Sequence, residues 1–176
     1  MEYDAVMFLV IMSGMPYAGK TYLSKSIASA LGFERVSHDD IWEEMNRADN
    51  KWPSFERTDK VARQRIADSL DQGIPVVADQ LGEVRWYRDE LKELALGHGA
   101  KPVLVYVNTP LDIRKERQER NRVSGERHHV SRKRFLAWQD MFEIPMCDEQ
   151  PIIFTSQNDT SEWIAQLEHL LGTSFP

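Results

Sequence analysis

The chain of 176 residues contains 41% hydrophobic and 28% charged residues, which suits one domain with its own core and excludes a disordered chain. Its net charge of −6 excludes a global basic field that would attract nucleic acid, but it does not exclude a local basic patch. Cys147 is the one cysteine, so no internal disulfide can form, which fits a reducing compartment.

The N-terminal residues favour a soluble cytoplasmic protein. Residues 1–12 carry two acidic residues and no basic residue before a short apolar run. That run is too short to span a bilayer, and it lacks the charged start of a signal peptide. A buried strand is the better interpretation.

Strand-like and helix-like patterns alternate along the chain. The predicted strands are Ala5–Met12, Phe33–Ser37, Ile74–Ala78, Pro102–Val107 and Ile152–Phe154. The predicted helices run from Lys20 to Leu31, from Phe55 to Leu70, from Val84 to Leu94, over residues 111–122, from a cap at Ser131 through Phe142, and from Trp163 to Leu171. This alternation is typical of a parallel sheet covered by helices, and it predicts one compact three-layer α/β domain.

A complete phosphate-binding pattern, G-x-x-x-x-G-K-[ST], lies between the first predicted strand and the first predicted helix. It consists of Gly14, Met15, Pro16, Tyr17, Ala18, Gly19, Lys20 and Thr21. We expect this loop to cradle the phosphates of ATP, with Lys20 on the β- and γ-phosphates and the hydroxyl of Thr21 on Mg²⁺. The alternative is a chance glycine-rich turn before a helix.

Two neighbouring acidic residues, Asp39 and Asp40, follow the second predicted strand. A kinase needs a carboxylate at this edge to orient the acceptor hydroxyl and take its proton. Asp40 with Glu43 also resembles a capping box, which would leave Asp39 as the base. His38 can titrate near neutrality, but a histidine beside two acids is more often a surface or paired group.

The third predicted strand ends in Asp79, an acid suited to holding Mg²⁺ directly or through another group. A strand-end or cap residue is the alternative. Many hydrolytic P-loop ATPases have a Glu directly after this Asp, where this chain has Gln80. No guanine-reading N-K-x-D motif is present, which argues against a GTPase.

Basic residues outnumber acidic ones between Asp112 and Arg134. The charges alternate, so a salt-bridged surface helix is one interpretation. The other is a lid over about residues 111–134, whose arginines stabilise the charge of a phosphoryl transition state. Arg117 and Arg120 share a helix face and are the first candidates. Arg114 and Arg122 come next, with a bend expected near Ser124 and Gly125.

These motifs together resemble the small P-loop kinases of the AAA_33, or zeta-toxin-like, group, to which polynucleotide 5′-hydroxyl kinase and chloramphenicol phosphotransferase are similar. The resemblance rests on "GMPYAGKT", "SHDD", "VVADQ" and "RKERQER", and covers Ala5 to about Pro145. It implies a five-stranded parallel sheet of the nucleoside-monophosphate-kinase type, with strand order 2-3-1-4-5 and an arginine-rich lid. It also implies Asp39 as base and Arg117 and Arg120 as phosphate clamps.

One position departs from the family pattern. Polynucleotide kinase-like members often have an Arg three residues after the base, where this chain has Trp42. An aromatic face thus replaces a bidentate phosphate clamp, unless Trp42 belongs to the core. We expect Asp40, Trp42 and Arg85 near the acceptor, with Trp52 and Phe55 extending an aromatic wall.

The sequence therefore predicts an ATP-dependent kinase acting on a hydroxyl of a small molecule, with ATP and Mg²⁺ as cofactors and no membrane partner. A nucleic-acid 5′-hydroxyl kinase is the first alternative, which the basic stretch favours and the net charge and Trp42 disfavour. A nucleotide-binding regulatory module without transfer chemistry is the second. The domain is expected to span residues 1–176.

Overall fold

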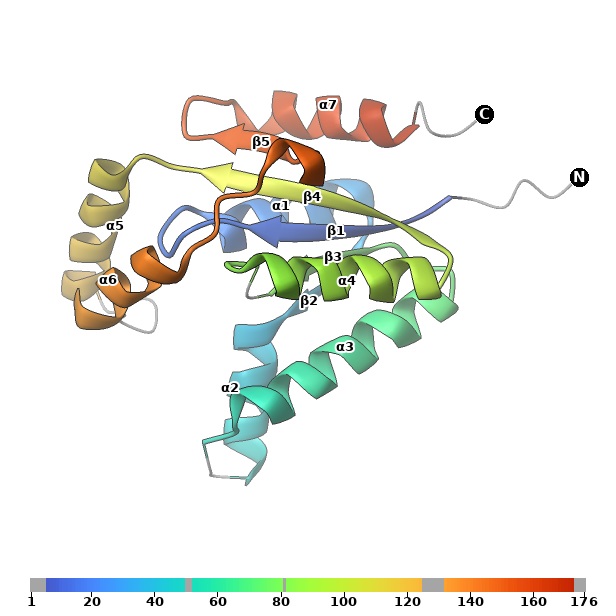
Figure 1. The fold of residues 1–176 in the computed structure, drawn as a ribbon, viewed down its shortest axis with the longest axis horizontal. Coiled ribbons are helices and arrows are strands. Elements are labelled where there is room, and N and C mark those ends of the chain that lie inside the picture. The colour runs from blue at the N-terminus through green and yellow to red at the C-terminus, as the bar shows by residue number, and fades with distance from the viewer. Residues whose placement is uncertain (1–5, 50–51, 81, 125–131, 173–176) are drawn as a thin grey trace, which may run out of the picture.

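A single parallel sheet forms the centre of the molecule (Figure 1). The computed structural model describes residues 6–49, 52–80, 82–124 and 132–172. The strands are β1 (Met7–Ser13), β2 (Glu34–Ser37), β3 (Val76–Asp79), β4 (Ala100–Asn108) and β5 (Ile152–Thr155). They pair in parallel in the order β2-β3-β1-β4-β5, which confirms the predicted topology.

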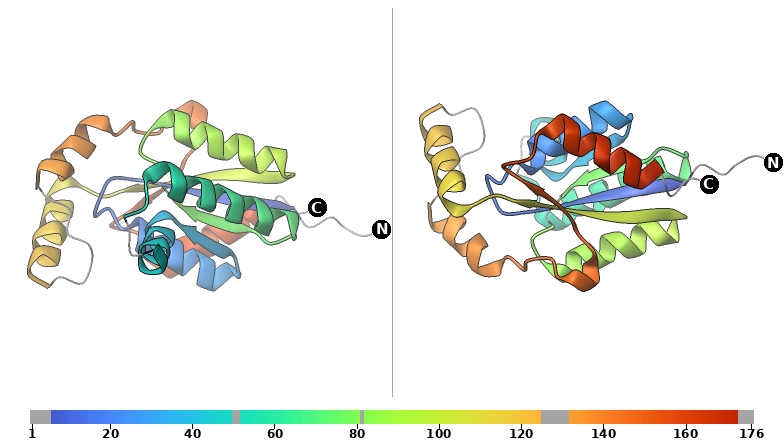
Figure 2. Two further views of the ribbon diagram at one scale, coloured as in Figure 1. Left: turned by 90° about the horizontal axis from the view of Figure 1, so that it is seen from below. Right: turned by 90° about the horizontal axis from the view of Figure 1, so that it is seen from above.

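Helices cover both faces of this sheet (Figures 1 and 2). They are α1 (Lys20–Leu31), α2 (His38–Asp49), α3 (Phe55–Asp71), α4 (Arg85–Gly97), α5 (Leu111–Ser124), α6 (Arg132–Met141), the 3₁₀ helix η1 (Cys147–Glu149) and α7 (Thr160–Gly172). The side chains of β1 alternate between two cores: Phe8 and Val10 pack with α1 and α7, whereas Leu9 packs with α3 and α4. A strand buried on both faces explains why this segment is continuously apolar.

Local sequence signals set most helix ends. Gly32 closes α1 in the left-handed conformation, with φ of 70°, and its N–H donates to Ala28. The Ser54 hydroxyl caps α3 by accepting a hydrogen bond from the N–H of Arg57. The start of α2 differs from the capping box considered for Asp40, because the hydroxyl of Ser37 accepts from the N–H of Asp40 at 3.4 Å.

The helices α5 and α6 project beyond the carboxyl ends of the strands (Figure 2). α5 has almost no apolar face, and its buried residues are Arg114 and Asn121. The guanidinium of Arg114 lies 5.6 Å from the centre of the Phe135 ring in α6, which replaces the usual apolar contact between helices. Ser131 and Gly125, predicted as cap and bend, lie outside the described residues.

Two further properties of the molecule concern the apolarity of its helices and the exposure of its cysteine. Within the described ranges, none of the helices has the length and apolarity that a membrane span requires. The Cys147 thiol in η1 is exposed.

Candidate active site

The phosphate-binding loop joins β1 to the N-terminus of α1. Gly14 and Gly19 have φ angles of 150° and 111°, which other residues rarely adopt. A Cβ on Gly14 would lie 2.7 Å from the carbonyl oxygen of Val107 in β4, so the loop packs too closely for any side chain there. The N–H groups of the first helical turn face an incoming anion, as phosphate binding requires.

Lys20 is held by two acceptors, one in this loop and one after β3. Its ammonium donates to the carbonyl of Gly14 and lies 3.5 Å from a carboxylate oxygen of Glu83. Both side chains are mostly buried, with 14% and 15% exposed. Burial raises the pKa of Glu83, and the nearby Lys20 charge opposes that shift. Sequence reasoning missed Glu83, and its place just after β3 was the one available signal.

Asp79 at the end of β3 belongs to a tight polar cluster. Its Oδ2 accepts from the Ser24 hydroxyl at 2.9 Å and from Arg35 at 2.6 Å. The same guanidinium donates to Asp40 at 2.5 Å, so it bridges two carboxylates. Gln80, the next residue, is buried and donates to the carbonyl of Val36 at 2.9 Å, which ties β3 to β2.

Asp39 differs from its neighbouring carboxylates, because no described residue donates a hydrogen bond to it. Its side chain is solvent-accessible. Partial removal from water and the charge of Asp79 raise its pKa, while His38 and Lys20 act in the opposite direction. Asp39 is therefore an unengaged carboxylate within electrostatic reach of both Lys20 and Asp79.

His38, the residue before Asp39, is buried and forms part of the wall of the site. Its ring stacks on Phe55, with centroids 5.4 Å apart. Burial lowers its pKa, and its Nε2 has no hydrogen-bond partner among the described residues. A neutral imidazole at neutral pH follows.

Arg117 reaches the phosphate-binding loop from α5. One of its terminal nitrogens donates to the carbonyls of Tyr17 and Ala18, at 3.0 and 2.7 Å. The Thr109 hydroxyl donates to the same Ala18 carbonyl at 2.8 Å. The residues of α5 and of the β4–α5 connection therefore contact the phosphate-binding loop directly.

The other predicted lid arginines lie differently. Arg120 is exposed, and no contact of its side chain is found within the described ranges. Arg122 pairs with Glu119 at the surface, at 2.6 Å. Arg114 is buried and donates to the carbonyl of Thr109 at 3.1 Å. Of the predicted set, only Arg117 contacts the loop in the part of the chain that the structure describes.

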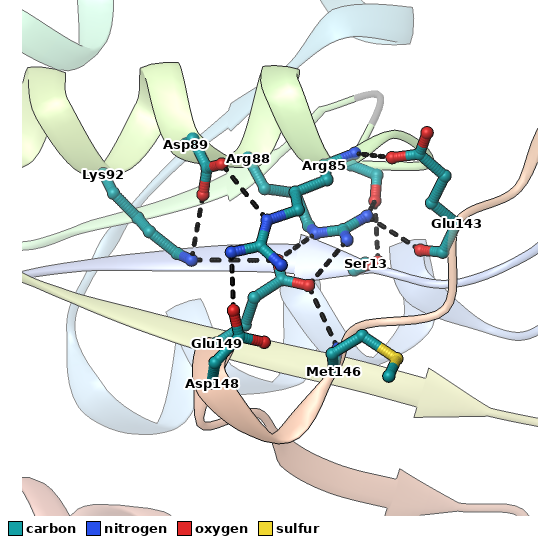
Figure 3. Close-up of polar contacts among 10 residues, drawn as sticks. Ser13, Arg85, Arg88, Asp89, Lys92, Glu143, Met146, Asp148 and Glu149 are labelled. Carbon is teal, nitrogen blue, oxygen red and sulfur yellow. Dashed lines mark hydrogen bonds and ion pairs between the residues drawn. The ribbon is translucent and has the colours of Figure 1, made fainter.

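The structure does not bring together the three residues that we expected near the phosphoryl acceptor, Asp40, Trp42 and Arg85. Asp40 and Trp42 lie on α2, and the Trp42 ring meets that of Trp52 edge-on, with centroids 4.9 Å apart. Arg85, at the first turn of α4, instead donates to Asp148 at 2.7 Å. Its guanidinium is thus engaged on the side of η1 (Figure 3).

A buried ion pair between α4 and η1 connects through Gly82 to Ser13, the residue before the phosphate-binding loop (Figure 3). Arg88 in α4 donates from two nitrogens to Glu149, at 2.7 and 2.9 Å. It also donates to the carbonyls of Gly82 and Glu143, at 3.2 and 3.0 Å. Gly82 in turn accepts from the hydroxyl of Ser13, the residue before the loop, at 2.7 Å. The pair joins residues 61 positions apart, so no local sequence signal predicts it.

The donor set suits Mg²⁺ only in combination with phosphates. No group of three or more His, Cys, Asp or Glu side chains among the described residues could hold a metal ion alone. Mg²⁺ commonly uses one or two protein oxygens together with water and substrate phosphates. Thr21 in the first turn of α1 is compatible with such a role. Asp79 is compatible through water, because Ser24 and Arg35 already occupy one of its oxygens.

Comparison with known proteins identifies the family. The sequence profile of AAA_33, described as an AAA domain, matches residues 9–145. The chain therefore belongs to the AAA_33 family. No curated protein sequence is a significant match.

Solved structures share the whole fold. A candidate kinase from Chloroflexus aurantiacus J-10-fl has a TM-score of 0.76 at 20% identity, covering 98% of this chain and 99% of that one. A gluconokinase from Sinorhizobium meliloti 1021 has a TM-score of 0.64 at 19% identity, covering 99% and 95%. Mycobacterium tuberculosis APS kinase CysC, in complex with AMPPNP and APS, has a TM-score of 0.67 at 16% identity, covering 94% and 98%. At these identities the likeness shows the fold alone.

Proposed function

We propose that this protein is an ATP-dependent kinase that transfers the γ-phosphoryl group to a hydroxyl of a small-molecule acceptor. The observation that carries the proposal is the unengaged carboxylate of Asp39 beside the loop lysine, Lys20. Asp40 and Asp79 both pair with Arg35, which leaves Asp39 as the carboxylate available to a substrate. The kinases among the structural neighbours support the same activity.

The transfer follows from these positions. The loop and Lys20 would hold the β- and γ-phosphates, and Thr21 with Asp79 would hold Mg²⁺, which neutralises phosphate charge when bound. Asp39 would orient the acceptor hydroxyl and take its proton. A bond forms between the acceptor oxygen and the γ-phosphorus, the bond from that phosphorus to the bridging oxygen breaks, and ADP leaves.

The lid completes this proposal. We assign residues 1–176 to one kinase domain, with a lid over about residues 111–134. Arg117 would stabilise the charge of the transferred group, since it already borders the loop through Tyr17 and Ala18. Arg120 would join it on closure.

The surroundings of Asp39 favour a small acceptor without phosphate groups. Trp42 and Trp52 offer aromatic faces in place of a phosphate clamp. The net charge of −6 disfavours binding of a polynucleotide, which makes the nucleic-acid 5′-hydroxyl kinase the weaker alternative.

The test is Asp39→Asn, compared with Asp40→Asn as a matched control. ADP release would be measured with a panel of hydroxyl-bearing metabolites and 5′-hydroxyl oligonucleotides, and ADP affinity by calorimetry. We expect Asp39→Asn to lose transfer by at least about 10²-fold while ADP still binds. Full turnover by Asp39→Asn would reject the base assignment. Nucleotide binding without turnover on any acceptor would favour the regulatory module.

A further inference from the structure

Glu83 is a carboxylate of the site for which the proposed reaction has no role. It follows β3 and faces Lys20, the residue expected to hold the nucleotide phosphates, at 3.5 Å. Its side chain is only 15% exposed, so the carboxylate is largely removed from water. A buried carboxylate is stable as an anion only with a partner that compensates its charge. Lys20 is that partner here.

The main chain of Glu83 is fixed by the segment that returns from the lid. We call residues 142–149, between α6 and β5, the return segment. The N–H of Glu143 donates to the carbonyl of Glu83 at 2.8 Å. The carboxylate of Glu143 accepts from the N–H of Arg85 at 2.6 Å, and its carbonyl accepts from buried Arg88 at 3.0 Å. The side chain of Glu83 therefore has a fixed origin and little freedom to move into water.

Few other groups face the Glu83 carboxylate. From α1 there is Lys20, and from α2 there is Asp39, whose negative charge opposes ionisation of Glu83. From α4 there is Tyr87, whose pKa is raised by burial and by its bond to Asp59, so it stays neutral. Once Lys20 turns to a phosphate, the described residues supply no second cation to Glu83, and only the main-chain N–H of Glu83 itself still favours the anion.

We propose that Glu83 is the counter-ion of Lys20 in the nucleotide-free site, that the nucleotide phosphates displace it, and that the displaced carboxylate then takes up a proton. The inference rests on the nucleotide-binding half of the proposed function and needs no phosphoryl transfer. Glu83 is thus a positioning residue: it holds the lysine in place before the nucleotide arrives. Because its carboxylate contacts Lys20 and its carbonyl accepts from Glu143, Glu83 also connects the phosphate-binding loop to the return segment.

The charges around Glu83 determine whether its carboxylate takes up or releases a proton when a nucleotide binds. In the empty site, burial raises the pKa of Glu83 and Lys20 opposes the rise. ADP bound without Mg²⁺ removes the opposing cation and brings negative phosphates nearer, so both changes raise the pKa of Glu83 further, whereas Mg²⁺ held by Thr21 and Asp79 would oppose them. The protein therefore takes up a proton on ADP binding at any pH between the pKa of Glu83 in the empty site and its pKa in the nucleotide-bound site.

The experiment is calorimetric titration of the full chain with ADP in the absence of magnesium, in buffers of different ionisation enthalpy, between about pH 6 and 8. The slope of binding enthalpy against buffer enthalpy gives the net protons taken up, to which the terminal phosphate of ADP also contributes. We expect the wild-type slope to exceed that of Glu83→Gln by up to one proton. Glu83→Gln should also bind ADP about 2- to 10-fold more tightly, because no carboxylate competes for Lys20.

Glu90→Gln is the matched control, since Glu90 lies on α4 and pairs with Arg63 instead of Lys20. It should keep the wild-type slope. An infrared difference spectrum of wild-type protein on ADP addition should gain a protonated carboxyl band that Glu83→Gln lacks, which distinguishes Glu83 from Asp39. Equal slopes for wild type and Glu83→Gln, or no such band, would overturn the inference alone. Absence of ADP binding to the wild type would overturn the proposed function as well.

Discussion

Glu149→Ala should destabilise the fold far more than Asp148→Ala, although the two residues are adjacent and each pairs with an arginine of α4. Glu149 and its partner Arg88 have 1% and 0% of their side chains exposed. Asp148 and its partner Arg85 have 56% and 45% exposed. The comparison therefore contrasts a buried pair with an exposed one, while chain position and charge type are matched.

The magnitude follows from what Glu149→Ala leaves behind. The guanidinium of Arg88 would stay buried without its carboxylate, and removing one partner of a buried pair costs about 3–5 kcal/mol. The N–H of Met146, which donates to Glu149 at 3.1 Å, would also lose its acceptor. Against a total stability of about 5–15 kcal/mol, this loss is a large fraction. Asp148→Ala removes only a contact that water and salt screen.

Urea unfolding monitored by circular dichroism gives the measurement. We expect a much lower midpoint for Glu149→Ala with an unchanged slope, and a midpoint for Asp148→Ala close to wild type. The double variant Arg88→Met/Glu149→Leu should recover part of the loss, since it removes both charges but also removes the Arg88 donor from the carbonyls of Gly82 and Glu143, of which Gly82 keeps Ser13. Equal midpoints for Glu149→Ala and Asp148→Ala would refute the reasoning.

Two further predictions concern the proposed transfer. Because burial and the charge of Asp79 raise the pKa of Asp39, kcat/KM should be full above that pKa and fall as pH is lowered through it, with the acid limb above the ordinary aspartate value of about 3.9. A pH–rate profile that stays flat to about pH 4 contradicts this assignment. Arg117→Met should reduce kcat by at least about 10²-fold, whereas Arg120→Met should have a smaller effect, because only Arg117 contacts the loop in the described structure. Steady-state kinetics decide this, and equal losses for the two variants would mean that closure brings both arginines to the phosphates.

The sheet was predictable from sequence because its signals are local. The apolar run that became β1 and the glycine that closes α1 each act within a few residues. The start of α2 was less predictable, since Ser37 and Asp40 both suit a helix terminus and the register of β2 selects Ser37.

The site was only partly predictable, because some contacts depend on distant chain segments. The phosphate-binding loop has a fixed spacing, so Lys20 and Thr21 could be named. Arg85 and Glu83 lie two residues apart, yet one pairs with Asp148 and the other with Lys20. The pairing of Arg85 with Asp148 depends on the packing of the return segment against α4, which no local sequence signal indicates.

The exposed thiol of Cys147 gives this protein a natural labelling position. It is the one cysteine of the chain, and it lies in η1 at the end of the return segment. A fluorophore or spin label can be attached there without removing any other thiol. Since the buried pair of Glu149 anchors this part of the chain, such a reporter would detect rearrangement of the return segment when a nucleotide enters the loop, in the wild-type sequence and in real time.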